Sequence, residues 1–197
     1  MSKPVALQPG SYYHIYNRGN NRENLFREER NYHHFLKLYA RYIPAVADTY
    51  AYCLLKNHFH VLVRLKTAVE LTRNGKVLSP SQQLGNLFNA YSKAINKAYG
   101  RTGSLFEHPF ERIEVISERH RLHLVTYIHR NPQTHGLIAD FRDWPFSSYH
   151  ALCSTRPTYL RRDDVLAWFG GSAELAAAHR RPDDDQRLAA LRLEDFD

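Results

Sequence analysis

Alternating side chains over residues 58–65 are the feature that most restricts how this chain can fold. Successive side chains of a β-strand point to opposite faces of its sheet, so the segment presents two sets of residues. One set carries His58, His60 and Arg64. The opposite set is apolar and is predicted to face the core: Phe59, Val61, Val63 and Leu65. The segment is therefore predicted to be a strand with two imidazoles side by side on one face.

This pair of histidines has two interpretations. Two imidazoles on one face of a sheet can act together as metal ligands. Surface histidines, or histidines hydrogen-bonded inside a fold, give the same pattern in a sequence. The pair alone does not decide between them, so a second element is needed.

That second element is residues 118–131, which are predicted to form a helix. Ser117 suits the N-cap, Glu118 suits the first turn, and Pro132 is expected to end the helix after Asn131. Tyr127 and Asn131 are four residues apart, so their side chains would stack on one helical face. An apolar stripe is available for packing: Leu124, Val125 and Ile128.

Tyr127 and Asn131 also have two interpretations. A phenol can attack an electrophile, and an amide oxygen can bind a metal ion. Alternatively, Tyr127 is an amphipathic core tyrosine and Asn131 is a helix-terminal residue in front of a proline. Without His58 and His60, the second interpretation would be preferred.

The remaining elements complete an α+β pattern. We predict a ferredoxin-like antiparallel sheet with helices packed on it, because the order is strand, helix, strand, strand, helix, strand, helix. The helix at 79–99 begins with a serine N-cap and a proline at its first position. The expected ranges are strands at 11–17, 48–56, 58–66 and 110–116, helices at 28–43, 79–99, 118–131 and 162–168, and a polar loop at 67–78.

Length and composition limit the classes of protein that need consideration. A chain of 197 residues is long enough for one domain with a proper core. We place that domain at residues 1–150 and expect residues 151–197 to be a helical extension packed on it. No apolar run approaches the ~20 residues of a membrane span, and two distant cysteines make no disulfide framework or zinc site. We therefore expect a cytoplasmic protein.

Charge is distributed unevenly along the chain. The net charge is +7, yet residues 163–197 hold nine acidic and four basic side chains. The body up to residue 162 is therefore strongly basic, and aromatic residues make up 13% of the chain. Cations neutralise phosphates and rings stack on unpaired bases, so this composition is compatible with a nucleic-acid partner. Many basic proteins have no such partner, and the composition does not prove one.

Taken together, several motifs resemble the single-tyrosine HUH endonucleases, specifically the REP-associated tyrosine transposases. HUH stands for histidine, hydrophobic residue, histidine, which is His58-Phe59-His60 here. The resemblance covers most of the chain, in this order: residues 12–19 (YYHIYNRG), 52–63 (YCLLKNHFHVLV), 103–106 (GSLF), 127–132 (YIHRNP) and 143–149 (DWPFSSY).

The resemblance implies a metal-dependent endonuclease and strand transferase that acts on single-stranded DNA. Tyr127 would be the nucleophile, giving a 5′-phosphotyrosine link and a free 3′-hydroxyl. His58, His60 and Asn131 would hold Mg²⁺ or Mn²⁺, although Asn131 could equally be a helix cap. Tyrosine has an ordinary pKa near ~10, so at neutral pH its hydroxyl needs help to lose its proton. The substrate would be a hairpin with a short flanking tetranucleotide, derived from repeated extragenic palindromes.

Four polar residues are candidates for contacts with the DNA backbone or a DNA end: Asn17, Arg18, Lys56 and Arg64. Each could equally be an ordinary solvated side chain. The segment after residue 106 departs from the family, because Glu107 and Glu111 stand where relatives often carry cations. DNA contacts at this strand entrance are therefore in doubt.

Three other residues lie in segments that could take part in the chemistry. Tyr91 is a weaker rival nucleophile that lacks the motif around Tyr127. His123 lies one helical turn before Tyr127 and could assist it. His129 is expected to face away from Tyr127.

Two further functions are considered beside the endonuclease. The first is a domesticated module that binds hairpin DNA without cutting it. The second is an RNA-binding ferredoxin-like domain, which would need aromatic stacking residues on its central strands. The resemblance of the segment after Trp144 predicts a monomer, and a dimer is left open. Whether Tyr127 acts within its own subunit is also left open.

Overall fold

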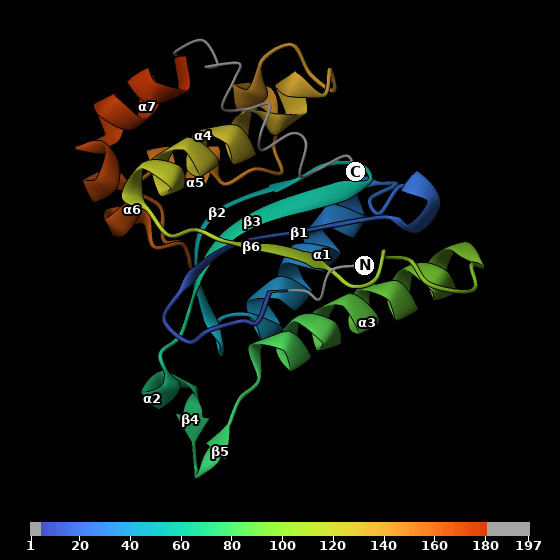
Figure 1. Ribbon diagram of the computed structural model, residues 1–197. Coiled ribbons are helices and arrows are strands. Elements are labelled where there is room, and N and C mark those ends of the chain that lie inside the picture. Colours follow the sequence, from blue (N-terminus) through green and yellow to red (C-terminus); the bar gives the residue numbers. More distant parts are fainter. Residues whose placement is uncertain (1–4, 181–197) are drawn as a thin grey trace.

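The computed structural model describes residues 5–180, which form an antiparallel sheet between two layers of helices (Figure 1). The order of its four strands is β2-β3-β1-β6, so β1 and β3 are central. This is the ferredoxin-like arrangement that the order of elements predicts. The bounds are Tyr12–Arg18 for β1, Ala47–Leu54 for β2, His58–Leu65 for β3 and Glu111–Glu114 for β6.

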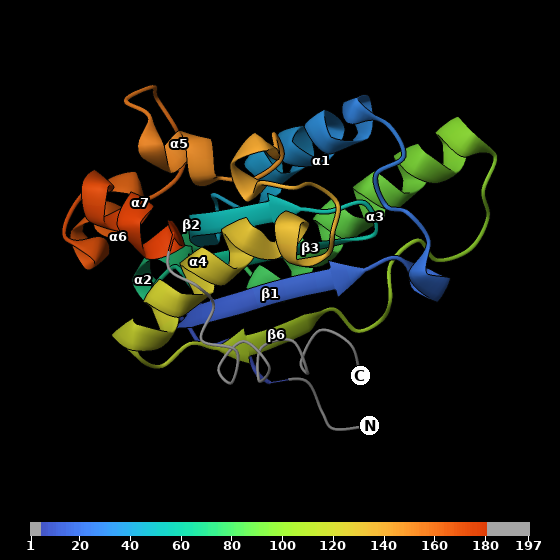
Figure 2. The ribbon, with the colours of Figure 1, turned by 90° about the horizontal axis from the view of Figure 1, so that it is seen from above.

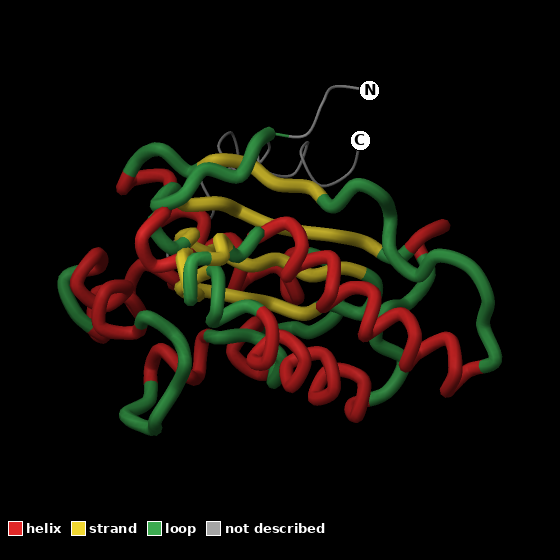
Figure 3. Tube along the Cα trace, turned by 90° about the horizontal axis from the view of Figure 1, so that it is seen from below, coloured by secondary structure: helices red, strands yellow, loops and turns green. Residues whose placement is uncertain are grey.

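Each face of the sheet is covered by its own helices (Figures 1 and 3). The helices α1 (Glu29–Tyr42) and α3 (Pro80–Tyr99) cover one face. Helix α4 (Glu118–Thr134) crosses the other face, as the view from above shows (Figure 2). It is flanked there by α5 (Tyr149–Cys153), α6 (Arg162–Phe169) and α7 (Ser172–Arg180). Short 3₁₀ turns lie at Asn20–Arg22 and Phe141–Asp143.

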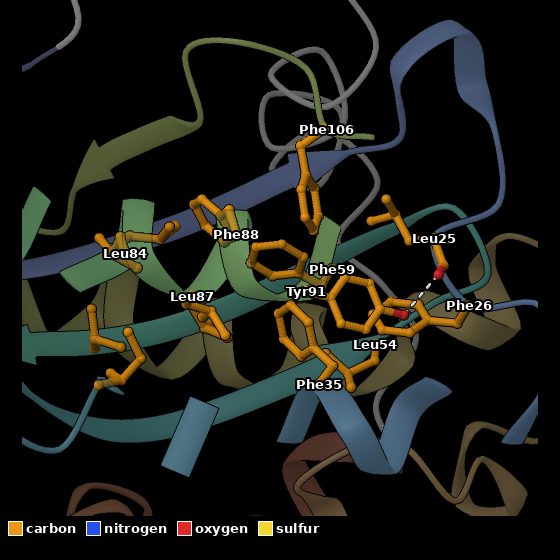
Figure 4. Close-up of a cluster of buried hydrophobic side chains, with 14 of the residues drawn as sticks. Leu25, Phe26, Phe35, Leu54, Phe59, Leu84, Leu87, Phe88, Tyr91 and Phe106 are labelled. Atoms are coloured by element: carbon orange, nitrogen blue, oxygen red, sulfur yellow. Dashed lines mark hydrogen bonds between the residues drawn. The ribbon is translucent and has the colours of Figure 1, made fainter. Parts of the chain in front are cut away.

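The core under α1 and α3 contains the apolar side of β3, as predicted (Figure 4). Phe59 is buried there against Phe35 and Phe88. Tyr91 is fully buried in the same cluster, and its hydroxyl donates a 2.7 Å hydrogen bond to the Leu25 carbonyl. The rival nucleophile is therefore part of the core.

The face of β3 that carries the histidines is also buried. Leu62 projects from that face and is fully buried, with apolar side chains of α4 packed over the same part of the sheet. The predicted stripe of α4 is buried in this second cluster: Leu124, Val125 and Ile128. Consequently the polar residues on this face lie in a packed layer and not on an open surface.

Helix α4 continues past the expected end at Asn131, so that boundary was wrong. Pro132 lies inside the helix, which runs to Thr134. The backbone N–H of His135 closes the last turn by donating to the Asn131 carbonyl at 2.9 Å. A proline costs a helix one N–H and crowds the preceding turn, but here only the final turn is affected.

The predicted polar loop at 67–78 contains regular structure instead. Helix α2 (Ala68–Leu71) begins with a capping box between Thr67 and Glu70. A small hairpin of β4 (Thr72–Arg73) and β5 (Lys76–Val77) follows, with positive φ angles at Asn74 and Gly75. Asn-Gly tolerates those angles and makes a tight hairpin turn without strain.

The two cysteines lie in different elements of the fold, β2 and α5. Cys53 and Cys153 are free thiols, one buried and one exposed, as expected for a chain without a disulfide framework. No helix in residues 5–180 combines the length and apolar character needed to cross a bilayer.

A chain of buried hydrogen bonds joins α7 to α4. The Leu175 carbonyl can only accept, so Nδ1–H of His179 donates to it at 2.7 Å. Nε2 of His179 then accepts from Nδ1–H of His129 at 2.8 Å, and Nε2 of His129 accepts from the Ser148 hydroxyl at 2.7 Å. Each imidazole must be neutral to keep these roles. Burial accordingly lowers the pKa of His179 to about 4 and holds that of His129 well below its usual range.

This network predicts a loss of stability in mild acid. Below pH about 6.5 the unfolded chain protonates His179, whereas the folded chain does so only near pH 4, so stability falls as the pH drops through this window. We expect His179→Gln to reduce the loss of unfolding free energy between about pH 7.5 and about pH 5 by about 2 kcal/mol. Urea unfolding at the two pH values measures this. Equal losses in the wild type and the variant would contradict it, and His33→Gln, at an exposed position, is the control.

Candidate active site

The register of β1 and β3 gathers polar side chains at one end of the covered face. Tyr16 lies opposite His60, and Arg18 lies opposite His58. His58 and His60 project from the same face, with ring centroids 5.0 Å apart. His14, from β1, joins them, and its Nε2 is 3.0 Å from Nδ1 of His60. The sheet therefore presents three imidazoles toward the layer that contains α4.

Helix α4 places Tyr127 directly against these imidazoles. The Tyr127 ring centroid lies 5.7 Å from that of His60 and 6.3 Å from that of His14. Tyr127 and the histidines belong to the same chain, so no second subunit is needed to bring them together. Residues almost 70 positions apart in the sequence thus meet across the sheet and helix layers.

Several polar atoms at this place are buried without a hydrogen-bond partner in residues 5–180. They include the Tyr127 hydroxyl, Nε2 of His58, and both polar atoms of the Asn131 side chain. Asn131 is fully buried one turn after Tyr127 and influences the pKa of His58. Native interiors rarely leave polar groups unpaired, because each costs roughly 1–3 kcal/mol. Such a concentration of them is typical of a site that binds something.

Hydrogen bonding fixes how His58 presents its nitrogens. Nδ1 of His58 lies 2.8 Å from the Asn57 side-chain oxygen, which can only accept. The proton of a neutral His58 is therefore on Nδ1, and Nε2 carries a lone pair. This is the protonation that a metal-binding imidazole requires at Nε2.

Burial keeps the imidazoles of the site neutral. It lowers the pKa of His58 to about 3, helped by the proximity of His135 and Arg18, while contact with Asn131 opposes the shift. It holds the pKa of His60 well below its usual range, and the other histidines contribute to this. It also lowers the pKa of His14 to about 3. At neutral pH each of these rings thus has one nitrogen that carries a lone pair.

Two of the predicted DNA-contacting residues lie beside the histidines. Arg18 shares the face of His58, and its guanidinium forms a 3.2 Å ion pair with Glu107. Glu107 is one of the two acids that depart from the family pattern, and it neutralises this cation. Lys56 is exposed in the turn between β2 and β3, immediately before Asn57 and His58.

The other two predicted contacts are not brought to the site. Asn17 is buried and points to the face of β1 opposite to that of Arg18. Its side-chain oxygen accepts a 2.8 Å hydrogen bond from the Arg18 backbone N–H. Arg64 shares the histidine face but lies near the far end of β3, where it forms a 3.0 Å ion pair with Asp48. Sequence alternation identified the face of Arg64 but not this partner.

Sequence reasoning missed His14 and His135 as members of the site. His14 lies on the same face of β1 as Tyr12 and Tyr16. This position becomes informative only when β1 is known to pair with β3. His135 caps α4 four residues after Asn131, and its ring centroid lies 5.1 Å from that of His58. The expected end of the helix at Asn131 concealed that spacing.

His129, expected to face away from Tyr127, belongs to the separate network with His179. His123 is half-buried one turn before Tyr127.

The donors present fit a divalent cation of mixed preference. Two neutral imidazoles and one amide oxygen can supply three ligands, and the C-terminal turn of α4 carries the negative end of its dipole. Within residues 5–180 there is no cluster of three His, Cys, Asp or Glu side chains that could hold an ion. A protein-only site would therefore depend on the Asn131 amide.

The site is closed in this conformation. Tyr127 is 4% exposed and His60 is fully buried, so a phosphate cannot reach the phenol without movement of covering side chains. Arg18, Lys56 and His135 are the more exposed residues around the histidines.

Comparisons with known proteins confirm the resemblance that the motifs indicate. A Haemophilus influenzae protein that carries the name REP-associated tyrosine transposase is 25% identical over 108 residues, which make up 52% of this chain and 59% of that relative. The chain thus matches about six-tenths of that relative's length. No protein-family model matches the chain.

The fold is confirmed by a solved structure of a REP-associated tyrosine transposase bound to a REP hairpin. The two chains align with a TM-score of 0.59 and 20% sequence identity. The match covers 77% of this chain and 84% of the other.

The removal of the Tyr91 hydroxyl and the removal of the Tyr127 hydroxyl should affect stability differently. Tyr91→Phe leaves the Leu25 carbonyl without its donor and should cost about 1–2 kcal/mol. Tyr127→Phe removes a buried hydroxyl that has no partner among the described residues, so stability should stay the same or rise by up to about 1 kcal/mol. Urea unfolding of both variants checks this. Equal destabilisation would mean that the Tyr127 hydroxyl has a structural hydrogen bond.

Proposed function

From its similarity to REP-associated tyrosine transposases, we propose that this chain cleaves and transfers single-stranded, hairpin-forming DNA through Tyr127. The observation that carries the proposal is the position of Tyr127 beside His60 and His14, one turn from Asn131, in a fold that matches a relative solved with a REP hairpin. The domain responsible is residues 1–150, with 151–197 as an extension.

Tyr127 would act as the nucleophile. Its hydroxyl loses a proton, the phenolic oxygen bonds to phosphorus, and the bond between phosphorus and the 3′-oxygen breaks. The products are a 5′-phosphotyrosine link and a 3′-oxyanion, which takes up a proton and becomes a 3′-hydroxyl. Attack by that hydroxyl reverses the reaction, and attack by another strand's 3′-hydroxyl completes a transfer, so no nucleotide cofactor is consumed.

His58, His60 and Asn131 would hold a divalent ion, Mg²⁺ or Mn²⁺. When bound, such an ion polarises the phosphate and offsets the charge that repels a nucleophile. The chain's own contribution is to keep both imidazoles neutral by burial and to fix the free Nε2 of His58 through Asn57. Nitrogen ligands favour softer ions, so Mn²⁺ should bind more tightly than Mg²⁺.

DNA would approach over the more exposed rim of the site. Arg18 and Lys56 lie there and can contact phosphates, which supply most of the affinity of nucleic-acid binding. Because Tyr127 and the histidines meet within one chain, the geometry supports action in cis by a monomer. We place this activity in the cytoplasm, on nucleoid DNA.

The observed geometry agrees with one of the two alternative functions and argues against the other. A module that binds hairpin DNA without cutting it is favoured by one observation, the burial of Tyr127. An RNA-binding sheet would use exposed rings on its central strands, but α4 covers the corresponding face of β1 and β3. That third function is not retained.

A covalent adduct tests the proposed chemistry. Wild-type protein incubated with Mn²⁺ and labelled single-stranded hairpins should form a protease-sensitive protein–DNA adduct, and Tyr127→Phe should form none. Denaturing gels followed by protease treatment measure it. The matched control is Tyr91→Phe, which removes a hydroxyl from the core and should retain the adduct.

The outcomes separate the candidate functions. An equal adduct with Tyr127→Phe would move the nucleophile to another residue. Tight hairpin binding with no adduct on any substrate would favour the module that binds without cutting.

The ion pair between Glu107 and Arg18 predicts an unusual effect on DNA affinity. Glu107→Gln frees the Arg18 guanidinium for phosphate, so hairpin binding should tighten severalfold at low salt. The slope of log affinity against log salt should steepen by about 0.7–0.9, the value for one additional phosphate contact. Glu70→Gln, which removes a carboxylate from α2 beyond the far end of β3, is the charge-matched control. Equal effects of both variants would show a change in net charge only.

A further inference from the structure

His14 is held against His60 by a direct polar contact between the two rings. Its Nε2 lies 3.0 Å from Nδ1 of His60, and the two rings stack with centroids 5.1 Å apart and an interplanar angle of 25°. Both residues are almost completely buried. Nothing in the reaction proposed above uses His14, so this contact requires its own explanation.

The two histidines of the HUH motif are engaged in the same way. His58 gives its Nδ1 to Asn57, and His60 gives its Nδ1 to His14. In each ring, Nε2 is therefore the nitrogen that could act as a ligand. A hydrogen bond from the second nitrogen of a metal-binding imidazole fixes both its tautomer and its orientation.

Either His60 or His14 can be the donor in the hydrogen bond between these two rings. If Nδ1–H of His60 donates to His14, Nε2 of His60 offers a lone pair. If Nε2–H of His14 donates instead, the proton of neutral His60 is on Nε2 and no lone pair remains there. The site can hold a cation through His60 only in the first arrangement.

The first arrangement leaves a cost at His14. The proton of His14 is then on Nδ1, which is buried and has no hydrogen-bond partner in residues 5–180. A buried unpaired group costs roughly 1–3 kcal/mol, so packing alone does not favour a histidine here. A phenylalanine would fill a similar volume without that cost.

We propose that His14 is a positioning residue, which accepts a hydrogen bond from Nδ1–H of His60 and so keeps the Nε2 lone pair of His60 in the site. The inference rests on the proposed function, because it assigns His60 as a ligand. It adds a residue from β1 to a site that otherwise consists of β3 and α4.

Three substitutions separate positioning from packing. His14→Phe keeps a ring of similar size and removes the acceptor. His14→Gln places an amide oxygen as many bonds from the backbone as Nε2 of histidine and restores the acceptor. His14→Asn is polar but too short to reach His60, so it should behave like the phenylalanine variant.

The first measurement is the tautomer of His60 in the metal-free protein. Two-bond proton–nitrogen NMR correlations on histidine-labelled protein distinguish Nδ1–H from Nε2–H, and the His60→Gln variant assigns the signals. We expect Nδ1–H in the wild type and in His14→Gln, and a change toward Nε2–H in His14→Phe. An unchanged tautomer in His14→Phe would overturn the inference.

The second measurement is Mn²⁺ binding, followed by electron paramagnetic resonance. We expect His14→Phe and His14→Asn to weaken binding by about 10–100-fold, with His14→Gln within a few fold of the wild type. If His14→Phe binds Mn²⁺ as tightly as the wild type, the inference about His14 is overturned, whereas the proposed metal site is not. If His58→Ala binds Mn²⁺ as tightly as the wild type, or if the wild type binds no Mn²⁺, the metal site itself is refuted. The NMR result then tests the positioning role of His14 alone.

Discussion

The packing of α4 onto the central strands is the interaction on which the rest of the structure depends. Leu124, Val125 and Ile128 are buried against the sheet together with Leu62 of β3. That apolar contact fixes the rotation of the helix about its axis. Tyr127 and Asn131, on the adjoining part of the helix surface, are thereby directed at the imidazoles of β1 and β3.

The same packing has a cost that the core under α1 and α3 does not have. There, Tyr91 has its hydroxyl satisfied by a carbonyl. Beneath α4, the hydroxyl of Tyr127, the amide of Asn131 and Nε2 of His58 are buried without such partners among residues 5–180. A fold selected only for stability would pair these groups or replace them with apolar ones. Their retention is the physical argument that this layer is a site. Because the site is closed, the proposed binding of DNA would have to displace some of its cover.

Sequence patterns predicted most of the fold and pointed to residues that the structure brings together in the candidate site. Period-two alternation located β3 and separated Phe59 from the histidines, and helical spacing put Tyr127 and Asn131 on one face. The patterns did not show that Leu62 makes the histidine face a second buried layer, because one leucine among polar residues is a weak signal. Pro132 suggested a helix end that tertiary packing overrode.

Pairings between distant residues were beyond sequence reasoning. Arg64 and Arg18 looked like free cations until the fold placed Asp48 and Glu107 beside them. His14 gained significance only from the register that sets β1 beside β3. The proposed roles come from the resemblance to a transposase family, whereas the contacts come from how this particular chain folds.

We propose that one helix and two strands of a single chain assemble a cation site beside a tyrosine. Anomalous diffraction from crystals grown with Mn²⁺ would locate the cation. We expect one strong peak, bonded to Nε2 of His58 and of His60 and to the side-chain oxygen of Asn131, with the Tyr127 ring facing it. A peak at another location, or none between these residues at saturating Mn²⁺, would contradict it.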